Sequence, residues 1–221
     1  MVFWIACAAG LLVAYLLGAT PTGYLAGRLL KGIDIREYGS KSTGATNVLR
    51  TLGAWPAVAV LAVDIAKGAA AVLFAGWFYP WLHALPAAAA PAGFGPQGAT
   101  PWAACLTGLA ALFGHSRSVW LNFTGGKSAA TGLGILLAMS WPVGLGTGVA
   151  FALVVALFRI VSLGSMLAAV AAIALVSILE KPLAYRLLVI AGGIFVIALH
   201  RANIRRLLAG TEPRIGRKSA R

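Results

Sequence analysis

Seven apolar segments constrain the fold of this chain more than any other feature. Of its 221 residues, 60% are hydrophobic and only 10% are charged. A soluble domain usually carries about 25% charged residues, whereas a membrane-spanning helix needs roughly 20 mostly apolar ones. We therefore expect an all-α polytopic integral membrane protein, one membrane-embedded domain over 1–221, with seven transmembrane helices at about 2–27, 54–80, 100–114, 129–142, 143–158, 162–179 and 184–199.

The basic residues predict the orientation of this bundle. The chain has 18 Lys and Arg against 5 Asp and Glu. When the connections are assigned alternately to two sides, sixteen basic residues fall on one side, and only Lys181 and Arg186 on the other. Basic residues concentrate in cytoplasmic loops, so we expect a cytoplasmic C-terminus and an N-terminus outside. Topology explains most of the excess charge, and we expect no nucleic-acid partner.

Three polar clusters fall on the predicted cytoplasmic side, at 38–50, at 114–131 and at 200–206 with an extension to Arg214. Each combines small residues with hydroxyls, an amide and a cation. Glycine lets backbone N–H groups approach an anion closely. Hydroxyl and amide groups add neutral hydrogen bonds, while Arg50 and Lys127 add full charge. Together the clusters predict a phosphate-binding site at one end of the bundle.

Other interpretations of these clusters remain open. Loops rich in Gly, Ser and Thr also cap helices, although three such loops on one side favour anion binding. The stretch 126–128 resembles the end of a Walker A motif but lacks the first glycine and a preceding strand. No set of His, Cys and Asp has metal-ligand spacing, so we expect neither a metal nor a cofactor. Cys7 and Cys105 are expected to be small buried hydrophobes.

Two further groups of residues depart from the apolar background. Asp64 and Lys67 are three residues apart and so share one helix face. Such a pair is costly in lipid unless it is partnered, so we expect it inside the bundle near the site, in a structural or a functional role. Arg159 with Ser162 and Ser165 is a weaker case of the same kind.

At these residues the chain resembles the bacterial acyl-phosphate:glycerol-3-phosphate acyltransferases, the PlsY family. The resemblance covers the whole chain and is carried by GIDIREYGS at 32–40, GATNVLR at 44–50, DIAKG at 64–68, GGK at 125–127 and HRANI at 200–204.

The chain departs from the usual family pattern in two places. Lys41 and Ser42 stand where Gly-Asn is common, and Ser128 stands where glycine is common after the lysine. Lys41 therefore adds a cation to the first cluster, and an asparagine amide is missing at position 42.

The resemblance implies seven helices in the bacterial inner membrane, with the N-terminus outside and the active site on the cytoplasmic side. It implies transfer of an acyl chain from acyl phosphate to the 1-position of sn-glycerol 3-phosphate. The products would be lysophosphatidic acid and phosphate, in the first acylation step of phospholipid synthesis. The lipid bilayer and the two substrates are the expected partners. Whether the chain also contacts the enzyme that makes acyl phosphate stays open.

By the same resemblance, Ser40, Thr46 and Asn203 would hold the acyl-phosphate headgroup. Arg50, Lys127 and His200 would engage glycerol 3-phosphate or the charge that develops during transfer. These six are the expected catalytic residues. The further expected binding residues are Gly39, Gly44, Asn47, Lys67, Gly125, Gly126 and Ser165.

Two questions stay open from the sequence. Without a paired carboxylate base, the proton of the attacking hydroxyl would pass either to a substrate phosphate oxygen or to His200. The competing function is a membrane carrier for an organic phosphate. Carriers tend to bind near the membrane midplane on broken helices, whereas these clusters lie at one end of the predicted helices.

Overall fold

The computed structural model describes residues 1–85 and 96–216, over which the chain is helical without a strand. Helices cover every apolar segment, the first segment with two of them, so the predicted all-α class is confirmed. Three of the tail's basic residues, Arg217, Lys218 and Arg221, lie outside the described residues. The helices are α1 Val2–Ala19, α2 Thr22–Lys31, α3 Ala45–Thr51, α4 Ala54–His83, α5 Pro96–Ser116, α6 Ala129–Met139, α7 Trp141–Phe158, α8 Val161–Ile178, α9 Leu183–Leu199 and α10 Arg201–Leu208.

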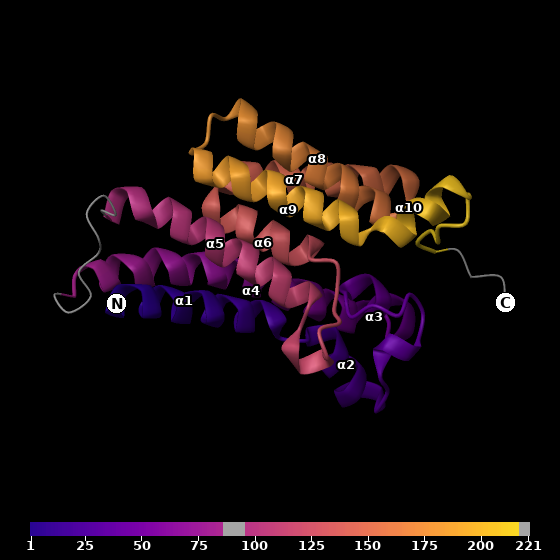
Figure 1. Ribbon diagram of the computed structural model, residues 1–221. Helices are drawn as coiled ribbons and strands as arrows, with labels where there is room; N and C mark the ends of the chain where they lie inside the picture. Colours follow the sequence, from indigo (N-terminus) through magenta and orange to yellow (C-terminus); the bar gives the residue numbers. More distant parts are fainter. Residues whose placement is uncertain (86–95, 217–221) are drawn as a thin grey trace.

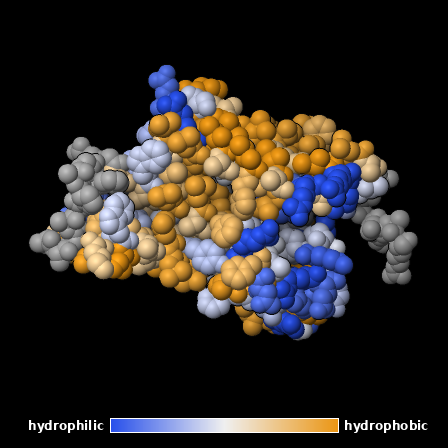
Figure 2. Space-filling model, viewed as in Figure 1, coloured by the Kyte–Doolittle hydropathy of each residue, from blue (hydrophilic) through white to orange (hydrophobic). Residues whose placement is uncertain are grey.

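The apolar helices run along one common direction, and α2, α3 and α10 gather at one end of the bundle (Figure 1). The N-terminus lies at the end of the bundle opposite α10 (Figure 1). The surface of the long middle region is hydrophobic, while hydrophilic residues collect beside α2 and α3 (Figure 2). This is the surface of an integral membrane protein with one strongly polar end.

By length and composition, four described segments can cross a membrane: Val2–Lys31, Ala54–His83, Trp141–Phe158 and Val161–Ile178. Helix α9, taken with α10 at a bend of 58°, makes a fifth. Helix α6 has 11 residues and is about 16 Å long, half of a hydrocarbon core of roughly 30 Å. It packs against α4 and α7 inside the bundle. The count of seven spans and the orientation remain predictions.

The first helix is not continuous over 2–27 as predicted, because it breaks at Thr20 and Pro21. Proline has no N–H and interrupts the helical hydrogen-bond ladder. The carbonyl of Ala19 instead accepts from Ser118 Oγ at 2.6 Å. The carbonyl of Thr20 accepts from Lys67 Nζ at 2.9 Å. A helix break inside an apolar bundle persists only where other groups satisfy the freed backbone in this way.

Glycines bring two helix pairs into close contact. A methyl group added at Gly68 of α4 would overlap the carbonyl of Thr131 on α6, and one added at Gly134 of α6 would overlap the carbonyl of Ile65 on α4. Gly18 of α1 stands in the same relation to the backbone of α5. Small residues allow such close approach of membrane helices, and here they fix the position of the short α6.

We expect Gly134→Ala to lower the stability of the protein by about 1–3 kcal/mol, because the new methyl group meets rigid backbone. Thermal unfolding of the purified protein in detergent measures this loss. Gly76→Ala is the matched control, since Gly76 lies on α4 with open space around its Cα. Equal unfolding temperatures for the two variants would contradict this account of the packing.

Candidate active site

The ion pair between Asp64 and Lys67 lies inside the bundle, as predicted. Lys67 Nζ is 2.8 Å from Asp64 Oδ1, and the two side chains are 6% and 1% exposed. Thr22 Oγ1 donates to the same carboxylate oxygen at 2.6 Å. With its ammonium also bonded to the carbonyl of Thr20, Lys67 holds the break between α1 and α2. Of the two roles left open for the Asp64–Lys67 pair, these contacts support the structural one.

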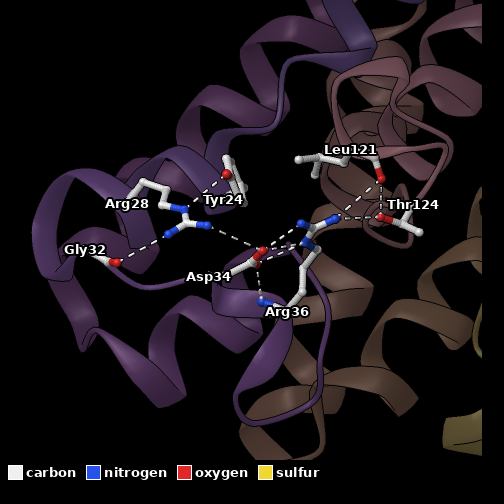
Figure 3. Close-up of polar contacts among 7 residues, drawn as sticks. All are labelled: Tyr24, Arg28, Gly32, Asp34, Arg36, Leu121 and Thr124. Atoms are coloured by element: carbon white, nitrogen blue, oxygen red, sulfur yellow. Dashed lines mark hydrogen bonds and ion pairs between the residues drawn. The ribbon is translucent and has the colours of Figure 1, made fainter.

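Arg36 joins the first polar loop to the second (Figure 3). Its guanidinium is 2.6 Å from Asp34 Oδ2 and donates to Thr124 Oγ1 at 3.3 Å. The hydrogen bonds from Arg36 hold the pKa of Asp34 below its ordinary value. The same guanidinium lies over the ring of Tyr24 at 5.3 Å, a cation–π contact. Asp34 thus pairs mainly with Arg36.

Asn47 organises the first cluster from within. Its amide nitrogen is directed at the carbonyls of Ile35, Tyr38 and Ser42 at 2.8–3.1 Å, and its Oδ1 accepts from the N–H of Ser40 at 2.8 Å. A methyl group added at Gly39 would overlap Oδ1 of Asn47. Both predicted binding residues therefore shape the loop that presents Ser40.

The two departures from the family pattern fall at left-handed backbone positions. Lys41 has φ +57° and Ser128 has φ +60°, a region that favours glycine. Ser128 Oγ donates to the carbonyl of Leu112 at 2.7 Å, which secures the start of α6. Glycine suits this backbone conformation, and Lys41 and Ser128 adopt it with a side chain added.

Gly125 and Gly126 pack against His115. A methyl group at Gly125 would overlap the carbonyl of His115, and one at Gly126 would overlap its ring. The N–H of Gly126 is already bonded to the carbonyl of His115 at 3.0 Å. These glycines set the course of the chain just before Lys127.

Lys127, Asn203 and Glu212 form a connected polar group. Lys127 Nζ donates to Asn203 Oδ1 at 2.7 Å, and Asn203 Nδ2 donates to Glu212 Oε1 at 2.6 Å. Ser162 Oγ and Arg206 Nε also donate to Glu212, each at 2.6 Å. Burial raises the pKa of this carboxyl, but the hydrogen bonds outweigh burial and lower it overall. The carboxylate is therefore ionised at neutral pH.

His200 follows α9 and is 3% exposed. Its Nδ1 lies 2.7 Å from the carbonyl of Val196. A carbonyl can only accept, so Nδ1 carries the proton and Nε2 keeps a lone pair. In this tautomer the neutral imidazole presents Nε2 as a hydrogen-bond acceptor.

A cavity of about 420 Å³ joins these groups to an apolar groove. Its polar end is lined by the three clusters and Glu212. The groove continues between α4, α6, α7, α8 and α9 along aliphatic and aromatic side chains such as Leu61, Leu136, Phe151 and Val189. The cavity thus combines cationic and neutral donors with a hydrophobic channel.

The structure brings nine of the thirteen predicted site residues to this cavity: Ser40, Gly44, Thr46, Asn47, Arg50, Lys127, Ser165, His200 and Asn203. Gly39, Lys67, Gly125 and Gly126 do not line it. The hydrogen bond between Ser162 and Glu212 was not predicted from the sequence. Their signal was weak, since Glu212 is one acidic residue within a basic tail and Ser162 was grouped with Arg159, whose side chain is exposed.

The fold defines a multi-pass membrane protein, and its cavity joins a polar end with cationic side chains to an apolar groove. The family model described as glycerol-3-phosphate acyltransferase matches residues 8–210. The chain therefore belongs to the glycerol-3-phosphate acyltransferase family.

Relatives and solved structures agree with this membership. The chain is 70% identical to glycerol-3-phosphate acyltransferase 2 of Rhizobium johnstonii, over 98% of this chain and 99% of that protein. It is 56% identical to glycerol-3-phosphate acyltransferase of Acaryochloris marina, over 100% and 97%. A crystal structure of PlsY (YgiH), an integral membrane glycerol 3-phosphate acyltransferase in its glycerol 3-phosphate form, is similar with a TM-score of 0.80 at 33% identity, over 95% and 96%. Its lysophosphatidic acid form gives 0.78.

We expect Ser128→Ala to lower stability by about 1 kcal/mol, because it removes the hydrogen bond to Leu112 and keeps the left-handed backbone. Ser128→Gly loses the same bond but relieves the backbone strain, which costs about 1–3 kcal/mol. The glycine variant should therefore unfold at the higher temperature in detergent. The reverse order would contradict this reading of Ser128.

Proposed function

We propose that this protein transfers an acyl chain from acyl phosphate to the 1-position of sn-glycerol 3-phosphate. The products are lysophosphatidic acid and inorganic phosphate. The site faces the cytoplasm of a bacterial inner membrane that the chain crosses seven times. The observation that carries the proposal is the cavity, which joins a cationic, hydroxyl-lined end to an apolar groove.

The shape of the cavity supports a lipid-borne donor. An acyl phosphate has a charged head and a hydrocarbon tail, and a groove between α4 and α8 suits the tail. Ser40 and Thr46 stand at the polar end together with Arg50 and Lys127, where hydroxyl and charged groups would hold phosphate oxygens. Glycerol 3-phosphate, which is soluble in water, would reach the same end from the aqueous side.

The chemistry supports a donor that is already activated. Phosphate leaves acyl phosphate without an enzymic nucleophile, so the protein has to orient two anions and stabilise charge on the acyl oxygen and the leaving group. Among the residues that line the cavity, the carboxylates are Asp64 and Glu212. Both are bonded to cations, which leaves neither free to act as a strong base.

His200 is then an acceptor that orients the hydroxyl of glycerol 3-phosphate. The proton of this hydroxyl passes to an oxygen of a substrate phosphate group, and the second pKa of such a group is about 6. The neutral imidazole with Nε2 unprotonated fits an orienting hydrogen bond.

The deciding experiment uses purified protein in liposomes with glycerol 3-phosphate and one of two donors, palmitoyl phosphate or palmitoyl-CoA. We expect lysophosphatidic acid to form from the acyl phosphate alone. Product from acyl-CoA at a similar rate would overturn the donor assignment. Transport of glycerol 3-phosphate without product would instead identify a carrier for organic phosphate.

We expect His200→Ala to lower kcat/KM roughly tenfold while leaving the shape of its pH profile intact. The wild-type profile should rise with pH through about 6, as the substrate phosphate becomes a dianion. On this proposal the inflection belongs to the substrate phosphate and not to His200. Loss of the inflection in the variant would assign the base role to His200.

The groove also predicts a change in acyl-chain preference for Gly148→Leu. Gly148 of α7 lines the cavity, and a methyl group there would meet only Leu133, at 3.8 Å. A leucine side chain should fill the groove and lower the rate with palmitoyl phosphate roughly tenfold or more relative to decanoyl phosphate. Gly76→Leu, on α4 away from the cavity, is the control. An unchanged ratio of the two rates would contradict the acyl assignment.

A further inference from the structure

Glu212 is held at the polar end by three donors from two different helices. Ser162 lies at the start of α8, Asn203 and Arg206 lie on α10, and each is 2.6 Å from a carboxylate oxygen of Glu212. The Glu212 side chain is 3% exposed. A buried carboxylate is tolerated where its oxygens are hydrogen-bonded and its charge is paired, and both conditions are met here.

The contacts with Glu212 and Lys127 together fix which way the Asn203 amide faces. The two ends of an amide have nearly the same shape but opposite hydrogen-bonding roles. Because Glu212 Oε1 only accepts, it selects Nδ2 of Asn203, so Oδ1 faces Lys127 at 2.7 Å. An amide turned by half a rotation would place N–H groups against an ammonium and a carbonyl oxygen against a carboxylate.

The segment that carries Glu212 is held by one backbone hydrogen bond before Glu212 and one after it. The N–H of Thr211 donates to the carbonyl of Arg206 at 2.8 Å, which closes α10. The N–H of Ile215 donates to the carbonyl of Arg159 at 2.8 Å, at the end of α7. Glu212 and Ile215 both line the cavity. The carboxylate is thus delivered to a defined place over the polar end.

We propose that Glu212 is a positioning residue that acts through Asn203. It fixes the orientation of the Asn203 amide, which in turn holds the Lys127 ammonium where the substrate phosphate binds. The inference rests on the proposed function for its kinetic consequences, because it assigns Lys127 and Asn203 to the phosphates of the substrates. The contacts that carry it do not depend on which donor the enzyme uses.

A double-mutant cycle tests the inference in the full-length protein. Glu212→Ala, Asn203→Ala and the double variant are compared for kcat and for KM of glycerol 3-phosphate. We expect Glu212→Ala to lower kcat/KM roughly 10- to 100-fold, within the range that contacting residues reach. The double variant should be no worse than Asn203→Ala alone. Additive losses would overturn the proposal, because a general structural role affects the two sites independently.

The Glu212→Gln variant removes the charge of Glu212 but can still orient the Asn203 amide. It also tests the proposal if the alanine variant does not fold. Its amide oxygen still accepts from Asn203 and Ser162, and only the hydrogen bond from Arg206 Nε is lost, so most of the activity should return. Glu37→Gln, which removes one charge from an exposed loop residue, is the matched control and should behave as wild type. A loss in Glu212→Gln as large as that of Asn203→Ala would overturn the orienting role.

Calorimetric titration with glycerol 3-phosphate, without any acyl donor, keeps this test apart from the proposed reaction. Weaker binding in Glu212→Ala, with no further weakening in the double variant, supports the inference even if acyl phosphate proves to be the wrong donor. Binding equal to wild type in Glu212→Ala, together with unchanged kinetics, would refute it.

Discussion

The architecture depends on satisfying a helix break inside an apolar bundle. Pro21 frees backbone groups where no water is available. Lys67 Nζ donates a hydrogen bond to the carbonyl of Thr20, and Ser118 Oγ donates one to the carbonyl of Ala19. Lys67 can be buried there because Asp64 lies 2.8 Å away. The break ends α1 and lets α2 begin as a separate helix. The polar loop that supplies Ser40 then follows α2, so the site is built on this ion pair.

The polar residues at this end divide into two groups by their contacts. Asn47 shapes the loops through its hydrogen bonds, and the glycines beside His115 shape them through their small volume. Ser40, Arg50, Lys127 and His200 line the cavity that those loops shape. A motif rich in small and polar residues therefore encodes both a scaffold and a set of ligands. Local rigidity matters because misplacing a catalytic group by even 1 Å is costly to rate.

Much of this could be predicted from the sequence, because hydrophobic length and charge asymmetry act over whole segments. The seven apolar segments are helical, the first as two helices, and Asp64 with Lys67 formed the expected interior pair. The break at Pro21 was missed because apolarity continues across it, although proline was the local signal. The roles of Gly126 and Glu212 depend on neighbours far away in the chain, His115 and Ser162. Spacing within a motif does not encode such contacts.

The order of the three clusters along the chain has a consequence for synthesis. Ser40 and Arg50 emerge from the ribosome first, Lys127 follows, and Asn203 and Glu212 come last. Until Glu212 meets Ser162 and Arg206, the polar end lacks its only carboxylate from the tail, and its cations repel one another. The helices can thus insert into the membrane before the site is complete. A chain interrupted before residue 212 would carry the helices of the bundle without a completed site.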